Sequence, residues 1–212
     1  TAGSLKDGQM VWALAKTKES FELFNGDVTD NYFLFTNPHQ FGKAINIRMT
    51  PIRVVCNNTL TLSLSQNADR MVTVNHRKAF DPAEVKEQMG IARQKMEEYK
   101  SMAAYLGSKP YTGENVIQYF NEVFGSPAKE KVEGVVPFTS RNSKTAFENL
   151  DVQPGAEFAQ GSWWTAFNSV TNMTDHLQGR SNDGRLVSSW YGRNRKVKLN
   201  ALDKALEYAD AA

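Results

Sequence analysis

The chain has 212 residues, and the 41% that are hydrophobic are enough to form a buried core, which excludes a disordered chain. Its 25 Lys and Arg residues nearly balance 23 Asp and Glu residues, so the net charge of +2 does not by itself indicate a nucleic-acid partner. A single cysteine cannot form an internal disulfide, which favours the cytoplasm. We expect no membrane association, because no apolar run approaches the length of a membrane span.

The first 80 residues have the pattern of β-strands. Apolar and polar residues alternate, or aromatic residues gather, in five segments, as half-buried strands require: 9–17, 21–24, 31–36, 43–50 and 70–77. Turn-forming residues such as Gly26 and Pro38 separate several of these segments. We therefore predict an antiparallel β-meander whose sheet extends over residues 9–55.

A long amphipathic helix is predicted over residues 81–107. Asp81 is suited to cap its N-terminus, Pro82 to occupy its first position and Glu84 to complete the cap. Behind this start, apolar residues recur at intervals of three and four: Val85, Met89, Ala92, Met96, Tyr99, Ala103 and Leu106. We interpret this stripe, including its methionines, as core that packs on one face of the sheet.

The remaining chain is predicted to be helical around one long connection. Further helices are expected over 113–124, 162–177 and 197–209, whereas residues 126–160, with three prolines and mixed charge, are predicted to form a long loop. The expected fold class is α+β, an antiparallel β-meander packed against a long amphipathic helix, with further C-terminal helices. It is a single domain over residues 1–212, with these regions: 1–80 mostly β, 81–125 helical, 126–160 loop and 161–212 helical.

The sequence gives no support to most kinds of enzyme site. The only cysteine, Cys56, lies in an apolar run with no histidine nearby, where a thiol is commonly a small buried group, so we expect it to be structural. Asp175 and His176 are adjacent rather than one helical turn apart, which does not suggest a zinc site. No phosphate-loop motif occurs, and residues 43–78 hold one acid, Asp69, which argues against a two-metal nuclease. We expect no enzyme, no cofactor and no metal.

Positive charge gathers in two segments. Residues 43–78 hold six basic residues and one acid, and residues 180–198 hold six basic residues and only Asp183 as an acid, with Trp190 and Tyr191 beside them. Such segments suit a groove that follows a phosphate backbone and stacks bases on aromatic rings, although two solvated basic faces would give the same pattern. The predicted contacts are Lys43, Arg48, Arg53, Arg77, Lys78, Arg185, Arg193, Arg195 and Lys196, with Asn57 and Asn58 as hydrogen-bond donors to sugar or base.

The predicted helix 162–177 carries polar residues on one stripe. Trp164, Asn168, Thr171 and Asp175 recur at helical spacing beside an apolar stripe. Two interpretations stay open. The stripe could contact bases or a second subunit, or its polar groups could be buried and satisfy the long loop that precedes the helix.

Several segments resemble one known family. The run TPIRVVCNNTL at residues 50–60 resembles the signature of a phage- and plasmid-borne family known mainly as domain of unknown function 932. Further segments resemble the same family in the same order: 1–5, 11–16, 32–37, 163–171, 175–176 and 191–192. The family normally has residues before Thr1, so we expect a truncated or processed N-terminus. The resemblance implies a phage context, and hence a bacterial host cytoplasm, but no reaction.

Two hypotheses of different kinds follow. The first is a phage or prophage nucleic-acid-binding protein that anneals single-stranded DNA in recombination, as a homo-oligomer and without nucleotide hydrolysis. Its basis is that a meander followed by a long helix is similar in outline to phage single-strand annealing proteins. The second is a phage or mobile-element protein–protein interaction factor in defence or counter-defence that does not bind DNA. Steep salt dependence of DNA binding would separate them.

Overall fold

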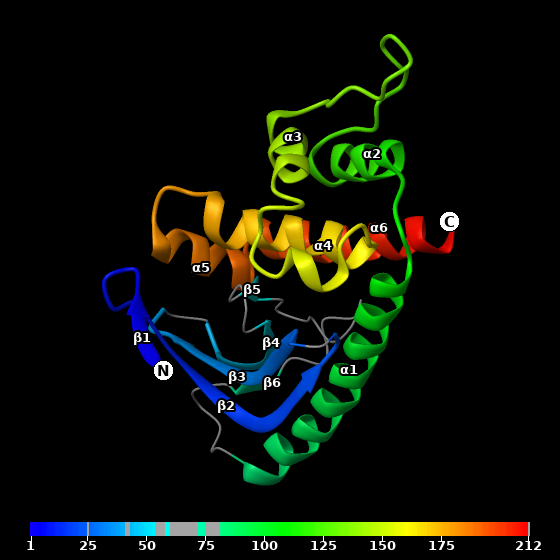
Figure 1. Cartoon of the computed structure of the whole chain (residues 1–212). Helices are drawn as coiled ribbons and strands as arrows, with labels where there is room; N and C mark the ends of the chain where they lie inside the picture. Colours follow the sequence, from blue (N-terminus) through cyan, green and yellow to red (C-terminus); the bar gives the residue numbers. More distant parts are fainter. Residues whose placement is uncertain (25, 41–42, 54–57, 60–71, 75–80, 212) are drawn as a thin grey trace.

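The computed structural model describes residues 1–24, 26–40, 43–53, 58–59, 72–74 and 81–211. Figure 1 shows a curved sheet formed by the N-terminal part of the chain and a group of helices formed by the C-terminal part. The α+β fold class is confirmed.

The described strands form one antiparallel sheet whose first five strands lie in chain order. The order is β1-β2-β3-β4-β5, and β6 also pairs with β4. This is the meander that the alternating pattern predicts. The strands are β1 (Ala2–Leu5), β2 (Met10–Glu22), β3 (Val28–Pro38), β4 (Ile45–Arg53), β5 (Asn58–Thr59) and β6 (Val72–Val74).

The two strands predicted over 9–17 and 21–24 are one strand, β2. Its pairing with β3 shifts register between Lys16 and Ser20, where extra residues form a bulge. The bulge coincides with a strong bend of β2 that is visible in Figure 1. The interruption of the apolar pattern therefore marks a bend within a strand and not a turn between strands.

Six α-helices follow the sheet in the described chain. They are α1 (Pro82–Ser108), α2 (Gly113–Phe124), α3 (Arg141–Glu148), α4 (Trp163–Asn172), α5 (Asn182–Tyr191) and α6 (Arg193–Asp210), with a short 3-10 helix η2 (Ala156–Ala159) and a π-helical turn η3 (Met173–Leu177). The start of α1 is confirmed: the Asp81 carboxylate accepts a hydrogen bond of 2.8 Å from the Ala83 N–H, and Pro82 occupies the first helical position.

Several predicted boundaries were wrong. Residues 126–160 are not one long loop, because they contain α3 and η2. Helix α3 has only eight residues, too few for a periodic pattern to stand out, and it starts at a capping box between Ser140 and Ser143. The helix predicted over 162–177 changes to π geometry after Asn172, and α5 was not predicted. The strand predicted over 70–77 is described only at residues 72–74, which form β6.

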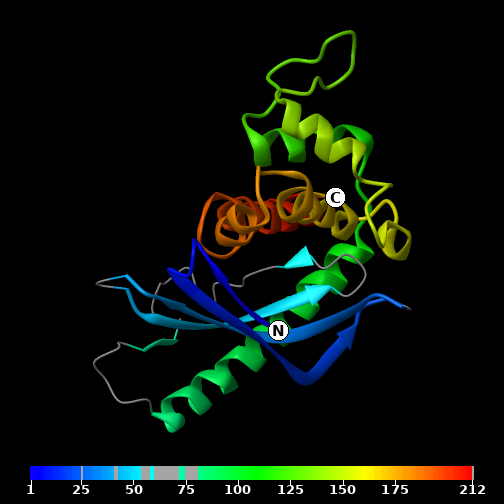
Figure 2. The same cartoon turned by 90° about the vertical axis from the view of Figure 1, so that its left-hand side faces the viewer.

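The sheet is covered on both faces. Adjacent strand residues point to opposite faces, and the neighbours Phe33 and Leu34 on β3 pack into different clusters. Leu34 is buried with Leu5 and Trp190, the latter from α5. Phe33 packs against the larger core, which contains Met96 and other residues of α1. Figures 1 and 2 show α1 running along the sheet, so the predicted packing of this helix is confirmed.

The larger core extends from the sheet through the helices. Its members include the fully buried Trp163 and Phe167 of α4, Phe120 of α2 and Ala205 of α6. Met96 is 3% exposed, as its place in the stripe predicts. The side chain of Met89 lies outside the described residues.

Residues 125–140 connect α2 to α3, and the middle of this segment projects away from the helices (Figure 1). We call this segment the projecting loop. Val132 and Val135 form an antiparallel bridge across a tight turn, in which Glu133 and Gly134 have positive φ angles of 52° and 80°. Both valines are 61% exposed. The projecting loop therefore carries apolar side chains at its tip, outside both cores.

Candidate functional site

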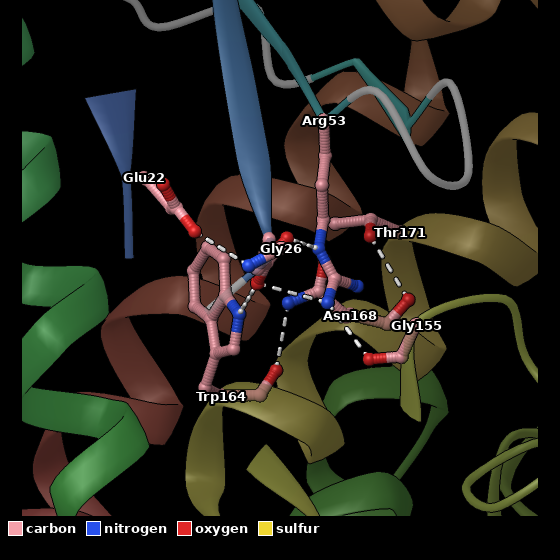
Figure 3. Close-up of polar contacts among 8 residues, drawn as sticks. Glu22, Gly26, Arg53, Gly155, Trp164, Asn168 and Thr171 are labelled. Atoms are coloured by element: carbon pink, nitrogen blue, oxygen red, sulfur yellow. Dashed lines mark hydrogen bonds and ion pairs between the residues drawn. The ribbon is translucent and has the colours of Figure 1, made fainter. Parts of the chain in front are cut away.

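Arg53 ends β4 inside the protein and not on a basic surface. Its side chain is 5% exposed, and its guanidinium donates hydrogen bonds of 2.5 and 2.9 Å to the two carboxylate oxygens of Asp27. A further bond of 2.8 Å reaches the Gly155 carbonyl (Figure 3). Arg53 is therefore not the phosphate contact that the sequence predicts. A carboxylate of this chain pairs with its guanidinium, and the guanidinium is too buried for a nucleic acid to reach it.

The same carboxylate joins the sheet to α4. The Trp164 indole N–H donates to Asp27 at 3.3 Å, and the Trp164 carbonyl accepts a bond of 2.9 Å from the Asn168 amide. Thr171 donates to the Asn168 carbonyl at 2.9 Å (Figure 3). These three residues are at most 3% exposed. The structure therefore supports the second interpretation of this stripe, in which its polar groups are buried. These three residues offer no exposed face that could contact bases.

Asp175, the fourth residue of the stripe, lies in the π-helical turn η3 and binds a buried lysine. Its Oδ1 accepts 2.7 Å from the Lys198 ammonium and 2.6 Å from the Ser189 hydroxyl. The Lys198 side chain is fully buried in α6. Burial lowers the pKa of Lys198, and the charge of Asp175 and its hydrogen bond act in the opposite direction. One carboxylate thus neutralises one cation at the contact of η3, α5 and α6.

Arg48 lies on β4 beside the end of α5. Its Nη1 donates to the Trp190 carbonyl at 2.9 Å, and its guanidinium lies 4.5 Å from the centre of the Tyr191 ring. The Tyr191 hydroxyl is hydrogen-bonded to that of Thr36 on β3. Burial lowers the pKa of Arg48; Tyr191 opposes this shift and Arg195 adds to it. The sheet and α5 therefore hold the guanidinium in a defined position.

Arg195, in the first turn of α6, completes a group of cations. Its Nε is buried and has no hydrogen-bond partner among the described residues. Its charge contributes to lowering the pKa of both Arg48 and Lys198, so Arg195 lies within electrostatic range of each of them. The cation group comprises Arg48, Arg195 and Lys198, with Tyr191 and Asp175 as its contacts. It joins the two basic segments that the sequence singled out.

The other predicted contacts lie in different places. Lys43, Arg193 and Lys196 are exposed, the last two at the start of α6. Arg185 is half-buried on α5 and donates to the Gly179 carbonyl at 3.4 Å. Trp190 is 1% exposed, which contradicts its predicted role as a stacking platform. Asn58 pairs with Arg53 through the β4–β5 ladder. Five residues named in the sequence analysis lie outside the described residues: Cys56, Asn57, Asp69, Arg77 and Lys78.

Comparison with known families gives one match. The family model described as Domain of unknown function (DUF932) matches residues 1–204. The chain belongs to this family. No curated protein and no solved structure matches it. The DUF932 match covers the sheet, the cation group and the helices as far as the later turns of α6.

Two residues that make buried ion pairs in this DUF932 protein, Lys198 and Asp27, are not among the site residues predicted from the sequence. Lys198 was counted only as one of several basic residues, although it shares a buried stripe of α6 with Ala201, Leu202 and Ala205. A lysine on such a stripe indicates burial with a partner, and this signal could have found it. Asp27 directly follows the turn-forming Gly26 in the sequence, and no local pattern distinguishes it from an exposed turn residue.

The described part of this DUF932 protein contains no group of three or more His, Cys, Asp and Glu side chains placed to hold a metal ion. Within the same residues, no helix combines the length and the apolar character needed to cross a membrane.

Proposed function

We propose that this protein binds nucleic acid through the face where β4 meets the start of α6. The observation that carries the proposal is that Arg48 and Arg195, from the two basic segments, come together there. The charge of Arg195 disfavours the charged form of Arg48, which is an electrostatic cost of placing these two cations near each other. A polyanionic partner would remove that cost, and a phosphate backbone is such a partner.

Neighbouring charges support the same face. Arg193 and Lys196 are exposed in the first turn of α6, which contains no acidic residue. The N-terminus of a helix also carries a partial positive charge from its aligned peptide dipoles. Several phosphates can thus be contacted side by side, and the release of their counterions would drive binding.

In its specific form, the proposal is annealing of single-stranded DNA by a phage or prophage protein that acts as a homo-oligomer in the bacterial cytoplasm, without nucleotide hydrolysis. Annealing needs phosphates to be held while bases stay free to pair. Burial of Trp190 fits this requirement, because its ring is not available to stack on bases.

The test is the affinity for single-stranded and duplex DNA over a salt series. We expect affinity to fall steeply with salt, and Arg193→Ala and Lys196→Ala each to reduce the salt slope by about one unit. Arg141→Ala, which removes an exposed arginine from the start of α3, is the matched control and should leave the slope unchanged. If the wild-type protein binds neither DNA, or if Arg141→Ala has the same effect, the proposal is wrong.

A protein–protein interaction factor is the second candidate function. The exposure of Val132 and Val135 at the tip of the projecting loop favours it, since exposed apolar side chains commonly mark contact surfaces. Two results together would support this candidate over the first. The wild-type protein would bind no DNA, and a folded variant with Val132→Ser and Val135→Ser would lose the biological effect of the protein.

A further inference from the structure

We infer that the second half of β2 has a structure that prevents this sheet from pairing edge to edge with a second copy of the chain. We call the side of β2 that faces away from β3, over residues 15–22, the open edge. The inference goes beyond the proposed function and holds whether or not the protein binds nucleic acid. It means that a homo-oligomer of this protein would assemble through another surface.

The outer side of β2 is only partly covered. The strand has 13 residues, and β1 pairs with it only from Met10 to Ala13. Thr1 continues this pairing, since its backbone exchanges hydrogen bonds of 2.7 and 3.1 Å with Leu14. Apart from β1 and β3, no described strand pairs with β2. Because an uncovered strand edge offers its backbone N–H and carbonyl groups to a strand of another molecule, the open edge is where association would occur.

A bulge interrupts the open edge. From Lys16 to Ser20, β2 advances by four residues. The facing stretch of β3, from Tyr32 to Asp30, advances by only two. The extra residues of β2 disrupt the regular spacing of its backbone groups and increase its twist, and the strong bend of the strand is visible in Figure 1. A regular partner strand therefore cannot follow this edge over its length.

The Thr17 side chain binds the backbone within the bulge. Its hydroxyl accepts a hydrogen bond of 3.2 Å from the Glu19 N–H and donates one of 3.1 Å to the Glu19 carbonyl. A backbone group that already has a partner gains little from a new one, because the first bond must be broken. Thr17 thus lowers the benefit of pairing at the centre of the open edge.

The charges of the open edge contribute less than its backbone. Four charged residues are exposed there: Lys16, Lys18, Glu19 and Glu22. Charged side chains, Lys above all, are common on protected edges and oppose pairing. However, the two Lys precede the two Glu, so an antiparallel second copy would bring opposite charges together. The bulge and its Thr17 contact are therefore the features that the experiment has to remove.

The experiment measures the mass of the protein in solution by sedimentation velocity over a series of concentrations. The first variant lacks Lys18 and Glu19, a deletion of even length that keeps every later side chain on its own face of the sheet. The second variant combines Thr17→Val with Lys18→Val and keeps the length of the chain. We expect both to associate, with an average mass about twice that of the wild type at equal concentration. Lys144→Val is the control, because it adds the same apolar side chain on α3, and it should behave as the wild type does.

A proline shows whether association occurs through the open edge. Backbone groups that point outward alternate along a strand, so the Lys16 N–H, two residues after the paired Leu14, points to the open edge. Lys16→Pro removes this donor and leaves the bonds to β3 in place. It should return both bulge variants to the mass of the wild type and leave the wild type unchanged. Circular dichroism checks that each variant is folded.

Association of the bulge variants that Lys16→Pro reverses supports the inference. If the deletion does not fold, the variant with Thr17→Val and Lys18→Val decides alone. The inference is overturned if this folded variant keeps the mass of the wild type, if Lys16→Pro does not reverse its association, or if Lys144→Val associates to the same extent. A wild-type oligomer that dissociates on Lys16→Pro also overturns it, because the open edge would then be an interface.

Discussion

Asp27 binds Arg53 through both of its carboxylate oxygens, although the carboxylate precedes β3 and the arginine ends β4. The β3–β4 register brings them together, since Thr29 lies opposite Arg53. Trp164 adds a third donor to the carboxylate, and Gly155 a third acceptor to the guanidinium. The pair is thus the point at which the sheet, α4 and the segment before η2 are joined.

Removal of one partner of this pair should destabilise the protein strongly. Asp27→Asn removes the carboxylate charge that pairs with the buried Arg53 guanidinium, and breaking a buried ion pair typically costs about 3–5 kcal/mol. The measurement is urea unfolding followed by tryptophan fluorescence. Lys131→Ala is the control, because it breaks an ion pair with Glu114 in which both side chains are more than half exposed, and it should change stability by less than about 1 kcal/mol. Equal effects of the two substitutions would contradict the role of the buried pair.

Gly155 should not tolerate a side chain. Its φ of +79° disfavours any other residue, and a Cβ would lie 2.8 Å from the Arg53 Nη2. Gly161 has nearly the same φ, +77°, but nothing within 4 Å of its Cβ position. We expect Gly161→Ala to cost about 1–2 kcal/mol for the backbone alone, and Gly155→Ala clearly more, because it also displaces Arg53. Unfolding free energies that agree for the two variants would show that Arg53 moves away freely.

The two neighbouring tryptophans of α4 should respond differently to Phe. Both are at most 1% exposed, but Trp164 donates to Asp27, whereas the Trp163 Nε1 has no partner among the described residues. Trp164→Phe removes a bond to a charged group, worth about 1.5–3 kcal/mol. Trp163→Phe removes only packing and an unsatisfied donor. Denaturant unfolding should therefore show the larger loss at residue 164, and the reverse order would refute the assignment.

Lys198 should make stability depend on pH. Burial lowers its pKa below the ordinary 10.5, and Asp175 opposes only part of that shift. Between the lowered value and 10.5 the unfolded chain binds more protons than the folded chain, so stability contributed by this group rises with pH over that interval. Lys198→Met lacks this titration.

The measurement is the unfolding free energy of the wild type minus that of Lys198→Met, from about pH 7 up to 10.5. The difference should grow in favour of the wild type as pH rises. Lys144→Met removes an exposed ammonium and controls for net charge. If this difference falls as pH rises, the effect of Asp175 on the pKa of Lys198 is larger than the effect of burial.

The sheet and α1 could be predicted because their signals are local. Alternation along the strands and the Asp81-Pro82 start need no distant partner. Helix α3 is shorter than the pattern that would reveal it, and the bend in β2 depends on its pairing with β3. Such features are set by tertiary contacts, which no window of sequence contains.

The candidate site was predicted only in part. Arg48 and Arg53 were placed on one surface, but they stand an odd number of residues apart on a strand whose pairing with β3 is continuous, so they point to opposite faces. That error could have been avoided from the sequence. The burial of Lys198 depends on Asp175 of η3, 23 residues away, and no local pattern gives the partner.

The shape of the projecting loop has a practical consequence. The turn at Glu133 and Gly134 is exposed and contributes to neither core, nor to the Asp27–Arg53 pair or the cation group. Exposed turns of this kind accept inserted peptides with little loss of stability. An epitope or a biotin-acceptor peptide placed between these two residues would give a handle for attaching the protein to a sensor surface in a single orientation.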